Sequence, residues 1–366
     1  MKKILFIGNV NSFLILQLAK NLLECHPNWV IDILSPEKSL EEQTPFRNVL
    51  AVDNNHPNAN KKIIKAFYVA FEMKKLLRRR QETYDIVHIL YISSAYRYLW
   101  NQLKTLSPKI VLTVFGGDFY KANWIMKLHL SKMVKESAII SATNPLTLAD
   151  FSNQFKISDS KTKLVRFGLS ILDEIDKVSP EDKKIWKEKH GIKPSQITVA
   201  CGYNGSPNQN LPAVLDSLKK FNSLSEKVIL CFQLTEKSNH VEEIIKTVEK
   251  SAFDYILFRE RFSDHALAQY RASMDIMIQV QTSDSFSGAM QEHLYAGSTV
   301  ITGTWLPYEV LDELGIDYVK INDVTEVGEA VANNIHCKFN TSKNKEIIAD
   351  LSKWSQTVDK WISLYD

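Results

Sequence analysis

The stretch of sequence that decides the fold is Ser283-Asp284-Ser285-Phe286-Ser287-Gly288-Ala289-Met290-Gln291-Glu292-His293-Leu294-Tyr295-Ala296-Gly297, which runs directly into Ser298-Thr299-Val300-Ile301-Thr302. It has the pattern of a strand end, a loop of small residues, a helix and a second buried strand. A loop of Ser and Gly that opens a helix leaves backbone N–H groups without partners, which suits a phosphate group. Glu292 follows Asp284 by eight residues, about two helical turns, where a second carboxylate can hold a sugar hydroxyl. The stretch therefore predicts a nucleotide-sugar site.

The same alternation of strand and helix extends outward through the chain. Apolar runs typical of strands lie at 3–7, 30–34, 86–90, 110–114, 138–140, 197–202, 228–232, 255–258 and 276–280. Helical spacing of apolar residues separates several of them, at 13–23, 211–221 and 241–252. This rhythm is typical of doubly wound sheets. We therefore expect an α/β protein of two Rossmann-like, doubly wound parallel-sheet domains that face each other across a cleft.

The predicted boundaries follow from the charged segment between the two halves. An N-terminal, acceptor-side domain is expected over 1–170, and a charged linker over 171–195. The nucleotide-sugar-binding domain is expected over 196–340. A C-terminal helix over 341–366, with Trp354 and Trp361, is expected to pack back toward the N-terminal domain.

Length and composition limit the class of protein. The chain has 366 residues, enough for two ordinary domains, with 45% hydrophobic and 24% charged residues. The apolar run after Met1-Lys2-Lys3 is too short for a secretory signal peptide, and no run is long enough to cross a membrane, so we expect a cytoplasmic protein. Four cysteines lie far apart without a paired spacing, which argues against a zinc site or a disulfide framework.

The charge is distributed unevenly between the two halves. Residues 1–170 hold 24 Lys and Arg against 13 Asp and Glu, or +11, whereas residues 171–366 hold 21 against 29, or −8. Much of the basic excess lies in 61–80, a segment that mixes cations with aromatic residues and is typical of peripheral contact with an anionic membrane. The alternative is a solvated helix that packs Phe67, Phe71 and Leu76 into the core. No nucleic-acid motif accompanies the charge, so no nucleic-acid partner is expected.

Several segments together resemble one family. The strand entry Asp85-Ile86-Val87-His88, the segment 262–276 and the spacing from Asp284 to Glu292 resemble the retaining family-4 enzymes of the GT-B glycosyltransferases. Asp284 stands where that family usually has a Glu. The segments 115–120 and 202–210 look more like the family-56 transferases, which add 4-acetamido-4,6-dideoxygalactose to a lipid-linked intermediate. The resemblance covers nearly the whole chain and implies retention of anomeric configuration, with the acceptor held by the basic first domain.

The site residues follow from these segments and from the resemblance. The expected catalytic residues are Asp118, Asp284 and Glu292. The expected donor-binding residues are Gly8, Asn9, Gly117, Tyr203, Asn204, Ser206, Arg261, Ser287, Gly288 and Ala289. Family-4 enzymes usually place an Arg and a Lys after the first strand of the second domain, and this chain does not. Arg259 and Arg261, at the end of a later predicted strand, are the candidates to replace that charge.

Each candidate also has a structural alternative. Asp118 can be a helix N-cap, Glu292 a solvated surface carboxylate, and Ser287 with Gly288 a tight turn. His88 in an apolar strand is expected to be a core residue with its hydrogen bonds satisfied. Four tryptophans are expected to serve packing, namely Trp124, Trp305, Trp354 and Trp361.

The predicted function is a metal-independent glycosyltransferase of the hexosyl type. It would move a sugar from a nucleotide-sugar donor to a lipid-linked or cell-surface glycan acceptor in bacterial polysaccharide biosynthesis, in the cytoplasm or on the inner face of the cell membrane. No clustered pair of Asp residues indicates a divalent ion, and no cofactor is expected. Two alternatives stay open: a nucleotide-sugar epimerase of the same fold, and a catalytically silent partner subunit.

Overall fold

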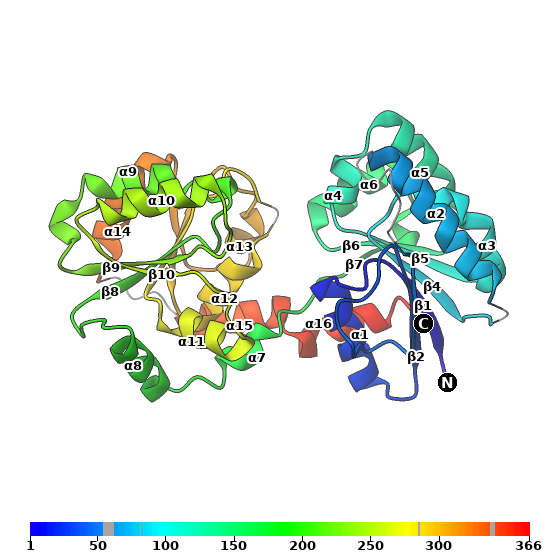
Figure 1. The fold of residues 1–366 in the computed structure, drawn as a ribbon, viewed down its shortest axis with the longest axis horizontal. Helices are drawn as coiled ribbons and strands as arrows, with labels where there is room; N and C mark the ends of the chain where they lie inside the picture. The colour runs from blue at the N-terminus through cyan, green and yellow to red at the C-terminus, as the bar shows by residue number, and fades with distance from the viewer. Residues whose placement is uncertain (54–61, 81, 285, 337–340) are drawn as a thin grey trace. The chain divides into compact units, whose positions relative to one another are not determined.

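The computed structural model describes residues 1–53, 62–80, 82–284, 286–336 and 341–366, and it divides the chain into two compact units. Met1–Gly168 with Trp354–Asp366 form the first unit, and Leu169–Lys353 form the second. Each unit is a parallel sheet covered by helices on both faces (Figure 1).

The first unit has a seven-stranded sheet in the order β3-β2-β1-β4-β5-β6-β7, and all of its strand pairs are parallel. The strands are β1 Lys3–Ile7, β2 Val30–Ser35, β3 Asn48–Ala51, β4 Ile86–Leu90, β5 Lys109–Val114, β6 Ile139–Ala142 and β7 Thr162–Leu164. One face carries α2 Lys62–Arg78, η1 Ser94–Tyr98, α3 Trp100–Leu106, α4 Gly117–Tyr120, α5 Trp124–Glu136 and α6 Pro145–Phe155 (Figure 1). The other face carries α1 Phe13–Cys25 and α16 Trp354–Ile362, and the short turn η2 Asp159–Lys161 precedes β7.

The central strands show why the sheet forms. Strand β4 is buried along its whole length, as expected of a parallel strand with helices on both faces. Its polar residue, His88, has both ring nitrogens satisfied, at 2.7 Å from the Tyr365 hydroxyl and 2.6 Å from Thr113 Oγ1. Burial lowers the pKa of His88 to about 3, so the ring is neutral. The prediction of a satisfied core histidine is confirmed.

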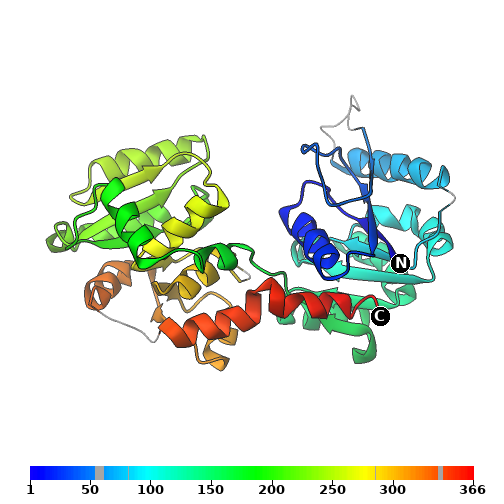
Figure 2. The ribbon, with the colours of Figure 1, turned by 90° about the horizontal axis from the view of Figure 1, so that it is seen from below.

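Both chain ends lie in the first unit. Lys2 Nζ donates to the Tyr365 carbonyl oxygen at 3.0 Å, and the two termini are close together in Figure 2. In α16, Trp354 and Trp361 are buried, and Trp361 Nε1 donates to the Arg166 carbonyl oxygen at 2.8 Å. The predicted packing of these two tryptophans is confirmed.

The second unit has a six-stranded parallel sheet in the order β10-β9-β8-β11-β12-β13. The strands are β8 Ile197–Cys201, β9 Val228–Gln233, β10 Asp254–Phe258, β11 Ile276–Gln279, β12 Thr299–Gly303 and β13 Val319–Ile321. One face carries η3 Pro207–Gln209, α9 Leu211–Lys219, η4 Asn222–Leu224, α10 Asn239–Glu249, η5 Val324–Glu326 and α14 Val327–Asn334. The other face carries α7 Ile171–Ile175, α8 Pro180–Lys189, α11 Asp264–Ser273, α12 Gly288–Ala296, α13 Glu309–Glu313 and α15 Thr341–Ser352 (Figure 1).

Two of the expected boundaries differ from the structure. The expected linker over 171–195 contains α7 and α8, and it belongs to the second unit because Leu172 and Trp186 are buried in that unit's core. The expected single helix over 341–366 is two helices. Ile348 of α15 is buried in the second unit, whereas Trp354 and Trp361 of α16 are buried in the first. The described helices include none with both the length and the apolar character that a bilayer crossing requires.

The order of strands fixes where ligands are expected to bind. In an open parallel sheet, ligands lie beyond the carboxyl ends of the strands at the point where the strand order reverses. That point lies between β1 and β4 in the first unit and between β8 and β11 in the second. We call these two places the first and the second switch point.

Candidate functional site

At the second switch point, hydrogen bonds join the loop after β8 and the loop after β11, both of which the sequence predicts to be at the donor site. Asn208, in the loop after β8, accepts from Thr282 Oγ1 at 2.6 Å through Oδ1 and donates to the Ser283 carbonyl oxygen at 2.9 Å through Nδ2. Gln281 Nε2 donates to the Tyr203 hydroxyl at 2.9 Å. Side chains of both loops therefore fix the shape of this edge of the sheet.

Helix α12 begins at the same place. Ser287 is its N-cap and is 5% exposed; its hydroxyl accepts from Met290 N at 3.2 Å. Among the described residues, the N–H groups of Gly288 and Ala289 have no hydrogen-bond acceptor. Two free N–H groups at a helix start form a site for an anion.

Asp284 is held by a tyrosine that the sequence did not single out. The buried Tyr308, in the loop after β12, donates its hydroxyl hydrogen bond to Asp284 Oδ2 at 2.5 Å. Burial and the neighbouring Asp284 carboxylate together raise the pKa of Tyr308 well above its usual range, so the hydroxyl stays protonated. Gln279 Nε2 donates to Gln281 Oε1 at 2.7 Å and approaches the Tyr308 hydroxyl at 3.4 Å. Asp284 thus joins the same network of side chains as Tyr203.

Glu292 lies in a different setting from the one expected. Its Oε2 accepts from Arg271 Nε at 2.8 Å, and the side chains are 13% and 5% exposed. The alternative of a solvated surface carboxylate is therefore wrong. Among the described residues, Glu292 Oε1 has no partner, so one oxygen is available to a hydroxyl. Arg271 itself gave no signal in the sequence, because its role depends on how α11 packs against α12.

The rest of this buried cluster fixes the state of a histidine. Arg271 Nη1 also lies 3.0 Å from Gln233 Oε1 and 3.1 Å from His293 Nε2. Since arginine can only donate, Nε2 accepts and the ring proton is assigned to Nδ1, which lies 3.0 Å from Ser298 Oγ. Burial and the Arg271 charge lower the pKa of His293 well below its usual range, so His293 is neutral.

The loop after β8 brings no cation to the second switch point. Asn204 Oδ1 accepts from Ser206 N at 2.9 Å, so these polar groups hold the turn. Gly205 N donates to Glu236 Oε2 at 2.8 Å, which places a carboxylate on this loop. Arg261 is exposed after the edge strand β10, and β9 lies between β10 and β8, so the strand ends are roughly 10 Å apart. In the part of the chain that the structure describes, no hydrogen bond or ion pair joins Arg261 to the two loops, and Arg259 is paired with Glu242 at 3.0 Å.

The first switch point holds a cavity of about 570 Å³. Gly8 and Asn9 line it after β1, and Tyr91 lines it after β4. A Cβ atom on Gly8 would meet Ile15 Cδ1 at 2.6 Å and the Leu90 carbonyl oxygen at 3.1 Å, so a larger residue here would require its neighbours to shift. Asn9 donates through Nδ2 to the Glu37 carboxylate. The structure thus brings both predicted residues of this loop to one cavity.

Asp118 does not line this cavity, but it is hydrogen-bonded to Phe115, which does, and it is 9% exposed. Its Oδ2 accepts from Ile92 N at 2.8 Å and its Oδ1 from Phe115 N at 3.0 Å, so it ties together the loops after β4 and β5. Burial raises the pKa of Asp118 to about 6, although these backbone hydrogen bonds oppose the rise. The N-cap alternative is wrong because Gly116 occupies that position of α4.

Tyr91 is the residue of the first switch point that the sequence analysis missed. It has φ +74°, which is uncommon for a residue other than glycine and often marks a functional position. Its ring is 47% exposed, and burial together with the nearby Asp118 carboxylate raises its pKa. Its hydroxyl oxygen lies 3.9 Å from where a Cβ atom on Gly117 would stand. Gly117, Asp118 and Tyr91 are therefore neighbours.

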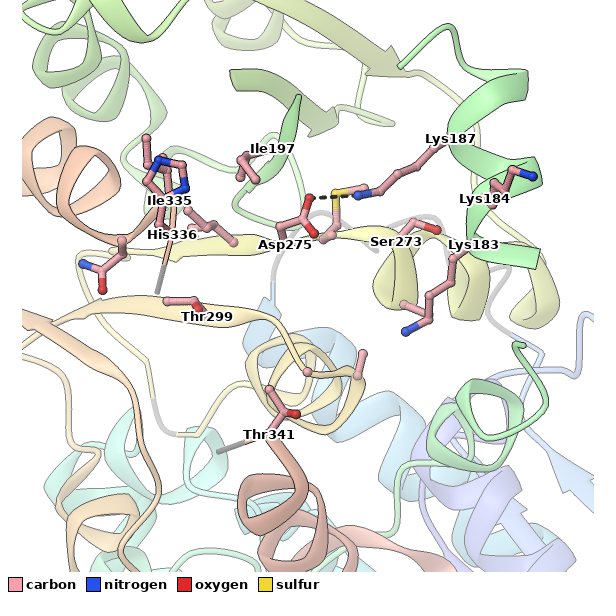
Figure 3. Close-up of a pocket in the computed structure, with 16 residues that line it drawn as sticks. Lys183, Lys184, Lys187, Ile197, Ser273, Asp275, Thr299, Ile335, His336 and Thr341 are labelled. Atoms are coloured by element: carbon pink, nitrogen blue, oxygen red, sulfur yellow. Dashed lines mark hydrogen bonds and ion pairs between the residues drawn. The ribbon is translucent and has the colours of Figure 1, made fainter. Parts of the chain in front are cut away.

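A further cavity, of about 660 Å³, lies at the amino ends of β8, β11 and β12 (Figure 3). Lys187 lies 2.9 Å from Asp275 there, and Asp275 also accepts from Thr198 N at 2.9 Å. This carboxylate serves the packing of α8 on the sheet, and none of the predicted site residues lines the cavity. Because ligands of open parallel sheets bind at the carboxyl ends, we place the candidate site at the switch points. In the described part of the chain, no group of three or more His, Cys, Asp or Glu side chains has a metal-binding arrangement.

Comparison with known proteins agrees with this architecture. Residues 3–144 match the family model described as glycosyl transferase 4-like. No curated protein matches the chain. Among solved structures, the chain is similar to a glycosyltransferase from Rickettsia africae, with 12% identity and a TM-score of 0.74 over 100% of this chain and 97% of that one. It is also similar to sucrose-phosphate synthase from Thermosynechococcus elongatus, with 11% identity and a TM-score of 0.73 over 100% and 98%.

A third similar structure contains ligands. Anabaena Alr3699/HepE in complex with UDP and glucose has 14% identity and a TM-score of 0.67, over 99% of this chain and 98% of that one. At these identities the likeness establishes the fold. The two parallel-sheet units and these neighbours show that the chain has the two-domain, Rossmann-like GT-B fold, and residues 3–144 match the glycosyl transferase 4-like model.

Proposed function

We propose that the protein is a glycosyltransferase that moves a sugar, with retention of configuration, from a nucleotide-sugar donor to a lipid-linked or cell-surface glycan acceptor in bacterial polysaccharide biosynthesis. The observation that carries the proposal is the second switch point. There, side-chain hydrogen bonds join two polar loops beside the N-terminus of α12, where backbone N–H groups have no acceptor. Similar folds are described as complexes with UDP and with UDP-glucose, which supports a nucleotide-sugar donor.

The second switch point suits the leaving group of such a reaction. Breaking a sugar–phosphate bond leaves negative charge on the departing diphosphate, so stabilising that charge is the main electrostatic task. The N–H groups of Gly288 and Ala289 supply donors for this charge. Asp284, held by Tyr308, and Glu292, held by Arg271, supply carboxylate oxygens for hydroxyl groups of the donor. We also propose that the reaction needs neither a metal ion nor a cofactor.

The first switch point suits the acceptor. Gly8, Asn9 and Phe115 line its cavity, and Asp118, at the start of α4, accepts a hydrogen bond from Phe115 N. A carboxylate whose pKa is raised to about 6 is mostly ionised at neutral pH and is still basic enough to accept a proton from an acceptor hydroxyl. We also propose that the cationic segment 61–80 holds the enzyme on the inner face of the cell membrane, where a lipid-linked acceptor lies. Residues 54–61 are outside the described part of the chain, so the described part of this segment is 62–80.

One observation favours a second candidate, a catalytically silent partner subunit. The loop after β8 holds no Lys or Arg between Gly202 and Asn210, and Gly205 N is bound to the Glu236 carboxylate. Less positive charge therefore faces a diphosphate than the family-4 resemblance implies.

A panel of UDP-, GDP- and dTDP-sugars tests the proposal. The expected result is release of nucleoside diphosphate from one donor. The anomeric configuration of the transferred sugar, measured by NMR, is expected to be the same in the product as in the donor. Asp284→Asn is expected to lower this rate, and Asp216→Asn, on the exposed face of α9, serves as the matched control. Donor binding without turnover, with any acceptor extract, would instead identify the silent subunit.

A further inference from the structure

Helix α5 carries apolar side chains on two faces. Leu130 and Met133 are buried in the core of the first unit. Trp124 and Leu128, which are one helical turn apart, are 74% and 63% exposed. A helix on a globular core needs a single apolar stripe. The second stripe therefore has no packing role within the described chain, and the prediction that Trp124 serves packing is wrong.

The exposure of Trp124 is a property of a formed helix. Asn123 is the N-cap of α5, and its Oδ1 accepts from Met126 N at 2.9 Å. The first turn is thus closed by a side-chain cap, which fixes the direction of the residues that follow. Trp124 and Ile125 are held outward by the same helix that buries Leu130.

Neighbouring elements extend this exposed surface. Phe67 of α2, Tyr98 of η1 and Ile125 of α5 line one hollow of about 290 Å³, and its wall is almost entirely apolar. The Phe67 and Tyr98 rings meet edge to face, with centroids 5.2 Å apart. We call the following exposed residues the apolar patch: Phe67, Phe71, Tyr98, Trp124, Ile125, Met126 and Leu128. Contiguous exposed apolar surface of this kind marks an interaction site.

The behaviour of α2 agrees with this surface. Phe67 and Phe71 are 47% and 56% exposed, so the alternative that they pack into the core is wrong for these two residues, whereas Leu76 does pack against the core. Among the residues of α2 whose side chains the structure describes, Val69, Ala70, Met73 and Leu77 are buried. Phe67 and Phe71 of α2 and Trp124 of α5 are thus left outside the core of the first unit.

Exposed cations lie on the helices of the apolar patch or next to them in the sequence. Arg78 and Arg79 at the end of α2 and Lys121 before α5 are exposed, and none of them has a carboxylate partner among the described residues. Further along α5, Lys132 and Lys135 are also exposed. An apolar surface accompanied by cations is complementary to a bilayer with anionic lipids, which is apolar inside and negatively charged at its surface. The same cations disfavour contact between the apolar patches of two copies of the chain, because like charges would meet.

From this arrangement we propose that the apolar patch docks the first unit on an anionic phospholipid bilayer, with Trp124, Ile125 and Leu128 entering the interface and these Lys and Arg residues contacting lipid phosphates. The main contact is then α5 rather than the cations of 61–80 alone. Tryptophan favours this depth because its ring is apolar and its N–H is polar. The inference deepens the proposed function and rests on it only for the lipid nature of the acceptor.

Vesicle flotation of the full chain tests the docking. Vesicles of phosphatidylcholine with phosphatidylglycerol are expected to carry the protein upward, vesicles of phosphatidylcholine alone are expected to carry much less, and added salt is expected to weaken binding. The double variant Trp124→Ser, Leu128→Ser is expected to lower the partition coefficient at least about tenfold, because the inserted apolar area is lost. Trp124→Phe, which keeps an apolar ring, is expected to retain most of the binding.

Ile185→Ser is the matched control for Ile125→Ser. Ile185 is 53% exposed on α8 and has lysines beside it, as Ile125 is 48% exposed on α5, but it lies in the second unit. Ile125→Ser is expected to weaken binding and Ile185→Ser to leave it unchanged. The proposal fails if the wild type does not float with anionic vesicles, if the double variant floats as well as the wild type, or if the double variant converts a dimer to a monomer. The vesicles contain no donor or acceptor, so this result is independent of transferase activity.

Discussion

Each unit buries a carboxylate beside its switch point, and the two carboxylates are satisfied in different ways. Glu292 in the second unit is paired with the buried Arg271, whereas Asp118 in the first accepts backbone N–H groups from two loops. A paired charge makes stability depend on its partner, and an unpaired buried carboxylate makes stability depend on pH. The two units therefore have similar strand orders, but different changes are expected to destabilise them: loss of a cation in the second unit and a rise in pH in the first.

The largest effect is expected from removing the cation of the second unit. Arg271→Leu leaves Glu292 buried without a counter-charge, and breaking a buried pair in this way costs about 3–5 kcal/mol. The free energy of unfolding, measured by urea titration, is expected to fall by about that amount. Arg259→Leu, which removes an exposed pair with Glu242, is the control and is expected to cost less than about 1 kcal/mol. Equal losses in the two variants would contradict the view that Arg271 compensates a buried charge.

The next effect concerns pH and Asp118. Its pKa is about 6 in the folded protein and about 3.9 in an unfolded chain. The folded state therefore binds more protons between these values, so the contribution of Asp118 to stability is fully present below about pH 4 and is lost as pH rises through 6. The loss amounts to about 3 kcal/mol, because one pKa unit corresponds to about 1.4 kcal/mol.

A pair of variants isolates this titration. Asp118→Asn is expected to abolish the fall, so the difference between wild type and variant in urea unfolding should change steeply between about pH 4 and 6. Asp150→Asn, an exposed carboxylate of the same unit, should run parallel to the wild type. A difference curve for Asp118→Asn that is flat across this range would show that Asp118 does not titrate there.

The strands and the donor loops were predictable from the sequence because buried parallel strands read as apolar runs, as at 197–202 and 276–280. The partners of the loop residues were not. Tyr308 follows β12 in the chain and Asp284 follows β11, and no local sequence pattern predicts a contact between two such loops. The charged segment 171–195 has the composition of a linker because only its few apolar residues enter the core. The exposure of Trp124 was not predictable, because composition cannot distinguish an outward tryptophan from a buried one.

Asp284 is a third case beside Glu292, which has a charged partner, and Asp118, which has only backbone donors. It is half-buried and accepts a hydrogen bond from the neutral Tyr308. Tyr308→Phe removes one hydrogen bond, which is expected to cost about 1 kcal/mol of donor binding, or roughly a fivefold rise in the Kd for the nucleotide sugar by calorimetry. Tyr318→Phe is the control, because Tyr318 donates to Asp312 at 2.8 Å in the same unit but away from the switch point. If both variants bind the donor as the wild type does, Asp284 is not held for the donor.

The smallest expected effect extends the comparison to an exposed carboxylate. Glu236 is bound to Gly205 N at the second switch point, where it opposes a diphosphate. Glu236→Gln keeps an acceptor for this N–H and removes the charge, so nucleoside diphosphate is expected to bind about two- to fivefold more tightly at low salt. The gain should disappear at high salt because exposed charges are screened, and Glu249→Gln, at the end of α10, should show no gain. An unchanged Kd for Glu236→Gln at low salt would mean that the diphosphate does not lie near Gly205, and would move the donor phosphates toward the start of α12 alone.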